Sequence, residues 1–314
     1  MKIVLALHGI GSSAEIVKDQ LVPLTRELSP RYEFVYLDGA VERERGPGEF
    51  DDRYVGFYEF SFANTPLGIA SYYLGPFYSY TTGYMTAEIR EALDNLDQFV
   101  REHGPFHGVF SFSQGASMAV SYLLDCQAHE SGTKLPFEFA VLFSSVSAFS
   151  PSKTCYGSIV EHLLGRDFRA IQAFPEAEFN ELTKSEQIFA ENLAPMFTGA
   201  KKMGSFTESI NFFKQRNQEA VPRVLHHSLT QDRITIPTVY VNGKGDPPAM
   251  SAQSRLVCGL CDQSLARVHH HSGGHGVPTE LFDVKTLIKM IDRASIEGAD
   301  RHVLHQDPTG IPQR

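Results

Sequence analysis

The chain has 314 residues, of which 42% are hydrophobic and 21% charged, so its composition is that of a globular protein with a sizeable core. The formal net charge of −9 disfavours nucleic acid or an anionic membrane as a partner. No apolar stretch reaches the roughly 18 to 20 residues that a membrane-spanning helix needs. Four cysteines are too few for a disulfide framework in a chain of this length, which predicts a cytoplasmic protein.

Apolar strands alternate with amphipathic helices along the chain. A first strand is expected at 3–7, followed by a helix that opens at Ser12, has Glu15 as the partner in a capping box, and is kinked or shortened by Pro23. Further strands are expected at 34–37, 108–110, 139–143, 237–241 and 265–268, and further helices at 86–101 (with Thr86 as N-cap), 116–124 and 280–294. Near-continuous apolar strands separated by helices predict a mainly parallel sheet with both faces covered.

Two long connections interrupt this pattern. The segment 40–84 has no clear periodicity but holds twelve aromatic residues between Phe50 and Tyr84, too many for a disordered region. The segment 148–230 is expected to be partly helical, for example at 183–193 and 207–216. We interpret both as lid or pocket walls around a functional site. The alternatives are ordinary packing aromatics for the first and a structural cap for the second.

The domain prediction is a single α/β domain at 1–297, followed by a polar tail at 298–314. Within it, aromatic side chains of the first long connection are expected to contact substrate. The candidates are Phe57, Tyr58, Tyr73 and Tyr80.

Ser113 lies in Ser111-Phe112-Ser113-Gln114-Gly115, at the expected turn from a strand to a helix. A serine at such a turn projects its hydroxyl above the sheet, and the N–H groups at the helix start face a developing oxyanion. The usual pattern is Gly-x-Ser-x-Gly, and Ser111 stands where its first glycine is usual. The motif predicts a nucleophile, against the alternative of an ordinary strand-to-helix turn.

A nucleophilic serine needs a base and a carboxylate, which follow it in the order acid, then histidine. Asp246 comes after the 237–241 strand through two glycines, and His275 comes after the 265–268 strand through Gly273-Gly274. His271 is the alternative base. Asp232 and Asp262 are rival acids that no glycine turn presents, and Asp246 as a plain turn residue stays an alternative.

The oxyanion donors are expected from two backbone N–H groups. One is that of Ile10, in His8-Gly9-Ile10-Gly11-Ser12 after the first strand, and the other is that of Gln114. His8 itself is expected to be a hydrogen-bonded structural residue rather than a second base.

Metal and cofactor chemistry is not expected. Three consecutive histidines, His269 to His271, cannot all bind one ion, because neighbouring side chains of an extended segment point to opposite faces. The pair Cys258 and Cys261 forms a lone C-x-x-C motif without a second pair, so we expect a structural role for it.

Five motifs together resemble the FSH family of serine hydrolases, which are α/β-hydrolases found widely in fungi. They are Leu7-His8-Gly9, Tyr36-Leu37-Asp38-Gly39, Phe112-Ser113-Gln114-Gly115-Ala116, Gly245-Asp246 and Gly273-Gly274-His275-Gly276-Val277-Pro278, and they span residues 1–295. The resemblance implies an α/β-hydrolase fold without a cofactor. It also implies that Ser113 is the nucleophile, Asp246 the orienting acid and His275 the base.

The resemblance further implies a substrate class. Many fungal members resemble stand-alone thioesterases of secondary metabolism, which release a polyketide acyl chain from the carrier protein of a synthase. We therefore expect hydrolysis of an acyl thioester or ester through an acyl-enzyme, with a carrier-bound polyketide as the first choice of substrate. The alternatives are a carboxylesterase or acyl-transferring cyclase for a small free ester, and a non-catalytic binding protein.

Overall fold

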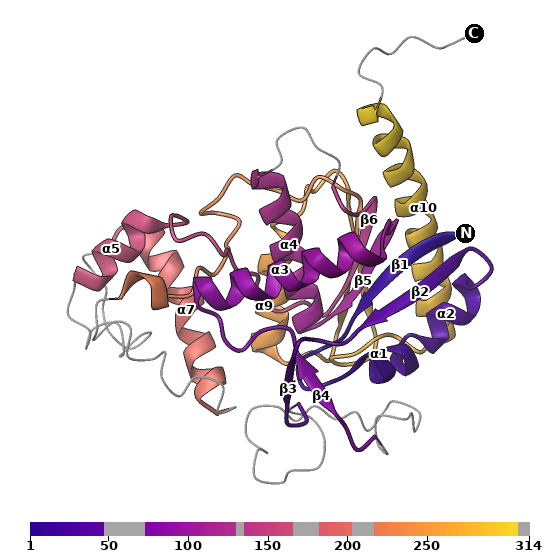
Figure 1. Cartoon of the computed structure of the whole chain (residues 1–314), viewed down its shortest axis with the longest axis horizontal. Coiled ribbons are helices and arrows are strands. Elements are labelled where there is room, and N and C mark those ends of the chain that lie inside the picture. Colours follow the sequence, from indigo (N-terminus) through magenta and orange to yellow (C-terminus); the bar gives the residue numbers. More distant parts are fainter. Residues whose placement is uncertain (47–72, 130–134, 166–181, 203–216, 307–314) are drawn as a thin grey trace.

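A computed structural model describes residues 1–46, 73–129, 135–165, 182–202 and 217–306 of the chain (Figure 1). Its centre is a sheet of six strands in the order β2-β1-β5-β6-β7-β8, in which every neighbouring pair is parallel. The strands are β1 (Lys2–Leu7), β2 (Tyr32–Leu37), β5 (Gly108–Phe112), β6 (Phe139–Phe143), β7 (Thr238–Gly243) and β8 (Ala266–His271). The predicted α/β-hydrolase fold with a parallel central sheet is confirmed.

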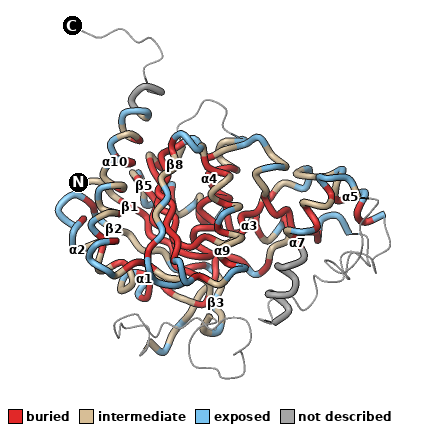
Figure 2. Tube along the Cα trace, turned by 180° about the vertical axis from the view of Figure 1, so that it is seen from behind, coloured by how far each residue is buried: buried red, intermediate tan, exposed pale blue. Residues whose placement is uncertain are grey.

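Helices cover both faces of the sheet. Helices α1 (Ala14–Gln20), α2 (Val22–Leu28) and α10 (Leu281–Gln306) pack on one face, and α3 (Thr86–His103), α4 (Gln114–His129) and α9 (Pro248–Cys258) lie on the other (Figure 1). Each face has its own apolar cluster, because side chains of a strand alternate between the two faces. Figure 2 shows the inner strands, such as β1 and β5, as buried, whereas the edge strands β2 and β8 are mostly intermediate or exposed. No helix in the described part of the chain is long and apolar enough to cross a membrane.

The first helix starts one residue later than expected and is divided in two. The N-cap of α1 is Ser13, whose side chain accepts a hydrogen bond from the N–H of Ile16, and not Ser12. The helix ends at Gln20, with Leu21 as its C-cap, and Pro23 lies in the first turn of the next helix, α2. The predicted effect of Pro23 is confirmed.

The third and last helices also differ from expectation. Thr86 is the first residue of α3 and Met85 its N-cap, since the carboxylate of Glu88 accepts a hydrogen bond from the Met85 N–H at 2.8 Å. Helix α10 continues through Gln306, well into the stretch expected to be a polar tail. It is anchored there by packing, because a Cβ on Gly298 would lie 2.1 Å from the carbonyl oxygen of Glu138.

The two long connections contain regular structure. In the first, β3 (Val41–Arg43) and β4 (Phe77–Ser79) pair antiparallel, which the sequence did not predict. In the second, α5 (Gly157–Gly165) packs against α7 (Lys184–Lys202), and η5 (Gln218–Ala220) follows. Helix α7 begins one residue later than the helix expected at 183–193 and continues beyond it. The helix expected at 207–216 lies outside the described residues. The role of either connection as a lid stays a prediction.

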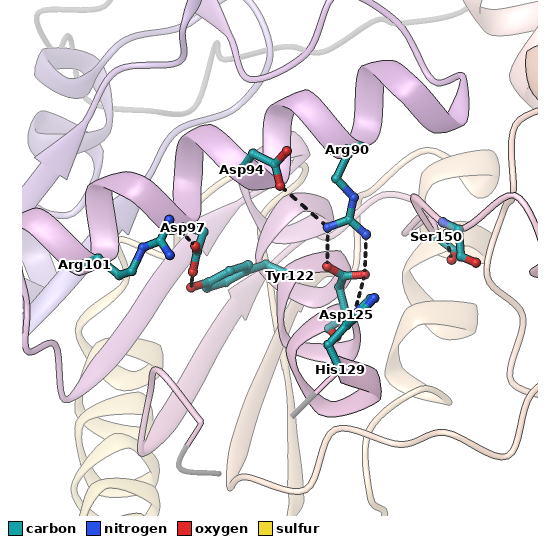
Figure 3. Close-up of polar contacts among 9 residues, drawn as sticks. Arg90, Asp94, Asp97, Arg101, Tyr122, Asp125, His129 and Ser150 are labelled. Carbon is teal, nitrogen blue, oxygen red and sulfur yellow. Dashed lines mark hydrogen bonds and ion pairs between the residues drawn. The ribbon is translucent and has the colours of Figure 1, made fainter. Parts of the chain in front are cut away.

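A polar network joins α3 to α4 (Figure 3). The guanidinium of Arg90 binds both carboxylate oxygens of Asp125 at 2.7 and 2.9 Å, and the hydroxyl of Tyr122 donates to Asp97 at 2.8 Å. These contacts fix α3 against the helix that begins directly after Ser113.

Candidate active site

Ser113 lies at a sharp turn between β5 and α4. Its φ of 53° is in the left-handed region, which residues other than glycine rarely adopt, and its N–H donates to the carbonyl of Phe143 at 3.0 Å. Gly115 allows α4 to start against the first strand, because its N–H donates to His8 O at 3.0 Å and a Cβ there would lie 2.6 Å from that oxygen. The turn has the geometry of a nucleophile elbow.

Ser111 fits this turn in place of the usual glycine. It is buried, its φ lies outside the positive region, and its hydroxyl donates to the carbonyl of Val141 at 3.3 Å. The small side chain is therefore accommodated inside the sheet, and the strain of the turn falls on Ser113.

The structure brings Ser113, His275 and Asp246 into one hydrogen-bonded chain. The Nε2 atom of His275 lies 3.0 Å from Ser113 Oγ, and its Nδ1 atom lies 3.0 Å from Asp246 Oδ1. An ionised carboxylate can only accept, so Nδ1 carries the proton of a neutral ring, and Nε2 is left to accept from the serine hydroxyl. This is the tautomer that a general base for Ser113 requires.

Backbone contacts between two loops hold the acid beside the histidine. Gly245 N–H donates to Gly273 O at 2.9 Å, and Lys244 N–H donates to His271 O at 2.9 Å. Gly243 is essential to this approach, because a Cβ there would lie 2.1 Å from Gly274 O. The loops after β7 and β8 therefore pack backbone against backbone.

The other candidates for base and acid lie elsewhere. The side chain of His271 is buried, its Nδ1 accepts from Gly273 N–H at 3.2 Å, and burial lowers its pKa. Asp232 pairs with Thr230, and Asp262 with Ser264, in turns away from the serine.

The two expected oxyanion donors are the N–H of Ile10, in the loop after β1, and the N–H of Gln114, the first residue of α4. Neither Ile10 N–H nor Gln114 N–H has a hydrogen-bond partner among the described residues, whereas Gly11 N–H donates to Tyr78 O at 2.9 Å. The loop from His8 to Ser12, called the first loop below, is held against β4 by this hydrogen bond and by a second one. In the second bond, Tyr78 N–H donates to Ser12 O at 2.8 Å. Free N–H groups beside the serine are what an oxyanion site requires.

The side chain of Gln114 connects the elbow to β4. Its Oε1 accepts from the hydroxyl of Ser79 at 3.0 Å and from Tyr80 N–H at 3.2 Å. Its Nε2 is buried without a partner in the described part of the chain. The loop that carries Ile10 and the start of α4 thus both contact β4 or the residue directly after it.

His8 has the structural role that was expected for it. Its Nε2 accepts from Gly39 N–H at 3.0 Å, so its Nδ1 carries the proton and donates to Gly9 O at 2.6 Å. The ring is fully buried, and this burial lowers its pKa to about 4. His8 is therefore neutral and both its nitrogens are occupied.

Two of the four expected substrate contacts can be placed. Tyr80 is 6% exposed, stacks on the ring of His8, and donates its hydroxyl to Leu37 O at 3.1 Å, so its described contacts support the first loop. Tyr73 packs edge-on against Phe77. Phe57 and Tyr58 lie outside the described residues. A contact of any of these side chains with substrate stays a prediction.

In the described part of the chain no group of three His, Cys, Asp or Glu side chains is arranged to hold a metal ion. His269 Nε2 is paired with Asp283 at 2.9 Å. Cys258 and Cys261 are free thiols, and burial raises the pKa of Cys261 to about 12.

Sequence reasoning missed one residue that contacts the candidate triad. The hydroxyl of Ser144, directly after β6, donates to Asp246 Oδ2 at 2.9 Å. Its position was the available signal, since Ser144 follows the fully apolar strand Phe139–Phe143, at the same edge of the sheet as the elbow.

Known proteins resemble the chain over most of its length. The model of the serine hydrolase (FSH1) family matches residues 1–287. Esterase alnB of Emericella nidulans is 35% identical over 302 residues, which cover 96% of this chain and 99% of that protein. Serine hydrolase cnsH of Penicillium expansum is 26% identical over 223 residues, or 71% of this chain and 91% of that protein.

Among solved structures, the monoacylglycerol lipase of Paleococcus ferrophilus matches with a TM-score of 0.44 and 14% identity, covering 94% of each chain. The family match itself includes the turn at Ser113 and both loops that carry Asp246 and His275. The chain therefore belongs to the serine hydrolase (FSH1) family and is a hydrolase.

Proposed function

We propose that the enzyme cleaves an acyl thioester or ester through a covalent acyl-enzyme on Ser113, with His275 as the base and Asp246 as the orienting acid. The observation that carries this proposal is the hydrogen-bonded chain from Ser113 Oγ through the His275 ring to Asp246, with 3.0 Å at each step. Three side chains that are far apart in the sequence meet in the order that acyl transfer requires.

The proposed reaction has two halves. Ser113 Oγ attacks the acyl carbonyl and transfers its proton to His275 Nε2, and the N–H groups of Ile10 and Gln114 stabilise the oxyanion. Collapse of this intermediate breaks the bond to the leaving thiol or alcohol, which takes the proton from His275. Water, activated by the same ring, then attacks the acyl-enzyme and releases the acid; a hydroxyl of the acyl chain in its place would release a lactone.

The finer substrate proposal is a polyketide chain carried on an acyl carrier protein, in fungal secondary metabolism. It is supported by the motifs shared with stand-alone thioesterases and by the aromatic side chains around β4, such as Tyr73 and Phe77, which suit an apolar acyl group. A cytoplasmic location belongs to the same proposal and is supported by the four free cysteines.

The second candidate is a carboxylesterase that acts on free esters, and the name of the 35% identical relative, esterase alnB, favours it. The kcat/KM values for an ester and a thioester of the same acyl chain distinguish the two candidates. We expect the thioester on a carrier protein to have the higher kcat/KM, and an equal or higher value for the free ester would favour the second candidate.

Intact mass is the test of the acyl-enzyme itself. After rapid mixing with the acyl thioester, the protein mass should rise by that of the acyl group, and Ser113→Ala should show no such adduct. The variants Ser113→Ala and His275→Ala should each lose most activity, and the double variant little more, because the two groups act as a unit. Losses that multiply in the double variant would contradict the proposed pairing.

A further inference from the structure

The carboxylate of Asp246 is deeply buried, with 1% of its side chain exposed. Its Oδ1 faces His275 Nδ1, and its Oδ2 accepts from the Ser144 hydroxyl at 2.9 Å. Among the described residues no third group bonds to either carboxylate oxygen. A buried carboxylate that lacks donors is costly, so half of the hydrogen bonding of this group depends on one serine.

Ser144 is placed by the strand between the nucleophile and the acid. Strand β6 lies between β5 and β7, and its last residue, Phe143, accepts from Ser113 N–H at 3.0 Å. The next residue, Ser144, donates its own N–H to Val241 O at 2.8 Å. The turn after β6 therefore contacts the elbow on one side and the strand before Asp246 on the other.

The backbone of Ser144 is strained. Its φ of 42° is in the left-handed region, where glycine would fit without cost and a side chain costs energy. What serine supplies there and glycine does not is the hydroxyl on Asp246. Ser113 is the other non-glycine residue of this site in the same region, with φ 53°.

We propose that Ser144 is a positioning residue of the catalytic machinery, a role that rests on the function proposed for Ser113. Its hydroxyl fixes the rotation of the Asp246 carboxylate, so that Oδ1 stays aligned with Nδ1 of His275. Without this bond the carboxylate rotates more freely, and the ring loses the orientation in which Nε2 faces the serine.

The variants Ser144→Ala and Ser144→Gly form a matched pair, because both remove the hydroxyl and only glycine relieves the backbone. Because both variants lose a hydrogen bond to a charged group, we expect kcat to fall about ten- to a hundredfold, by the same factor in each. KM should change less than about twofold, since substrate is not contacted. Ser144→Gly should unfold at a temperature no lower than Ser144→Ala does.

Ser145→Ala is the control. This neighbouring serine is equally buried, but its hydroxyl donates to Val146 O, within its own turn. We expect wild-type kcat for it.

Coupling to the acid distinguishes positioning from a general loss of structure. In an Asp246→Ala background, Ser144→Ala should lower kcat by less than about twofold, because the group it positions is gone. Wild-type kcat in both Ser144 variants, or an undiminished loss in the Asp246→Ala background, would overturn the inference. If Ser113→Ala is inactive and the Ser144 variants are not, only the inference fails; if Ser113→Ala stays active, the proposed function fails.

Discussion

The substitution Tyr80→Phe tests how the first loop is held in place. The Tyr80 hydroxyl accepts from His8 N–H at 2.8 Å and donates to Leu37 O at 3.1 Å, and the ring is 6% exposed. Phenylalanine keeps the ring and its packing on His8, so the change removes two hydrogen bonds and leaves a buried N–H unpaired.

The expected cost is about 2 to 4 kcal/mol, because an unpaired buried group costs about 1 to 3 kcal/mol and a second bond is lost with it. For a chain of this size, that lowers the melting temperature by about 3 to 6 °C. His8 begins the loop that carries Ile10 N–H, so kcat should fall about tenfold, less than the roughly hundredfold that follows complete loss of an oxyanion donor.

The assay is calorimetry together with steady-state kinetics on an activated ester. Tyr122→Phe is the matched control, since its hydroxyl also donates one bond, to Asp97 at 2.8 Å, but in the α3–α4 network (Figure 3). It should lose about 1 kcal/mol of stability and no kcat. Wild-type kcat and stability in Tyr80→Phe would refute the reasoning, and a raised KM with unchanged kcat would instead make Tyr80 a substrate contact.

Three further predictions concern the elbow, acid stability and the helix network. Gly115→Ala should lose about 1 to 3 kcal/mol and most activity in thermal and kinetic assays, because its Cβ meets a backbone oxygen at 2.6 Å, whereas Gly157→Ala, with open space, should lose neither. Because burial lowers the pKa of His8 to about 4, the unfolded chain binds a proton between about pH 6.5 and 4 that the folded chain does not. The free energy of unfolding should therefore fall as the pH drops through this window, by about 3 kcal/mol on account of this residue. Urea unfolding should show a smaller fall over the same window for the His8→Gln variant. Arg90→Met removes the ion pair with Asp125, but its side chain is 38% exposed, so we expect a loss of about 1 kcal/mol or less, reduced further by salt, with kcat unchanged.

The sequence was sufficient to predict the sheet and the three central side chains. The four inner strands are almost uninterrupted apolar runs and could be recognised as such, whereas β8 could be recognised only from residues 265–268, because it continues as three histidines. Asp246 and His275 follow such strands through glycines, and parallel strands end at one edge of the sheet. Their meeting with Ser113 follows from the topology.

Contacts between side chains of separate segments could not be predicted. The strands β3 and β4 have three residues each, which is too few to show an apolar periodicity. The support that Gln114 receives from Ser79 could therefore not be predicted. Ser144 stands in a run of small polar residues, and only the coordinates show which hydroxyl reaches Asp246. The end of α10 was missed because the close approach at Gly298 depends on a distant carbonyl.

Labelling with a fluorophosphonate tests the central claim most directly. The account predicts one covalent adduct per chain by intact mass, located on Ser113 by peptide mapping, absent in Ser113→Ala and formed far more slowly in His275→Ala. An adduct on another residue, or labelling of the folded wild-type protein that persists unchanged in Ser113→Ala, would contradict it.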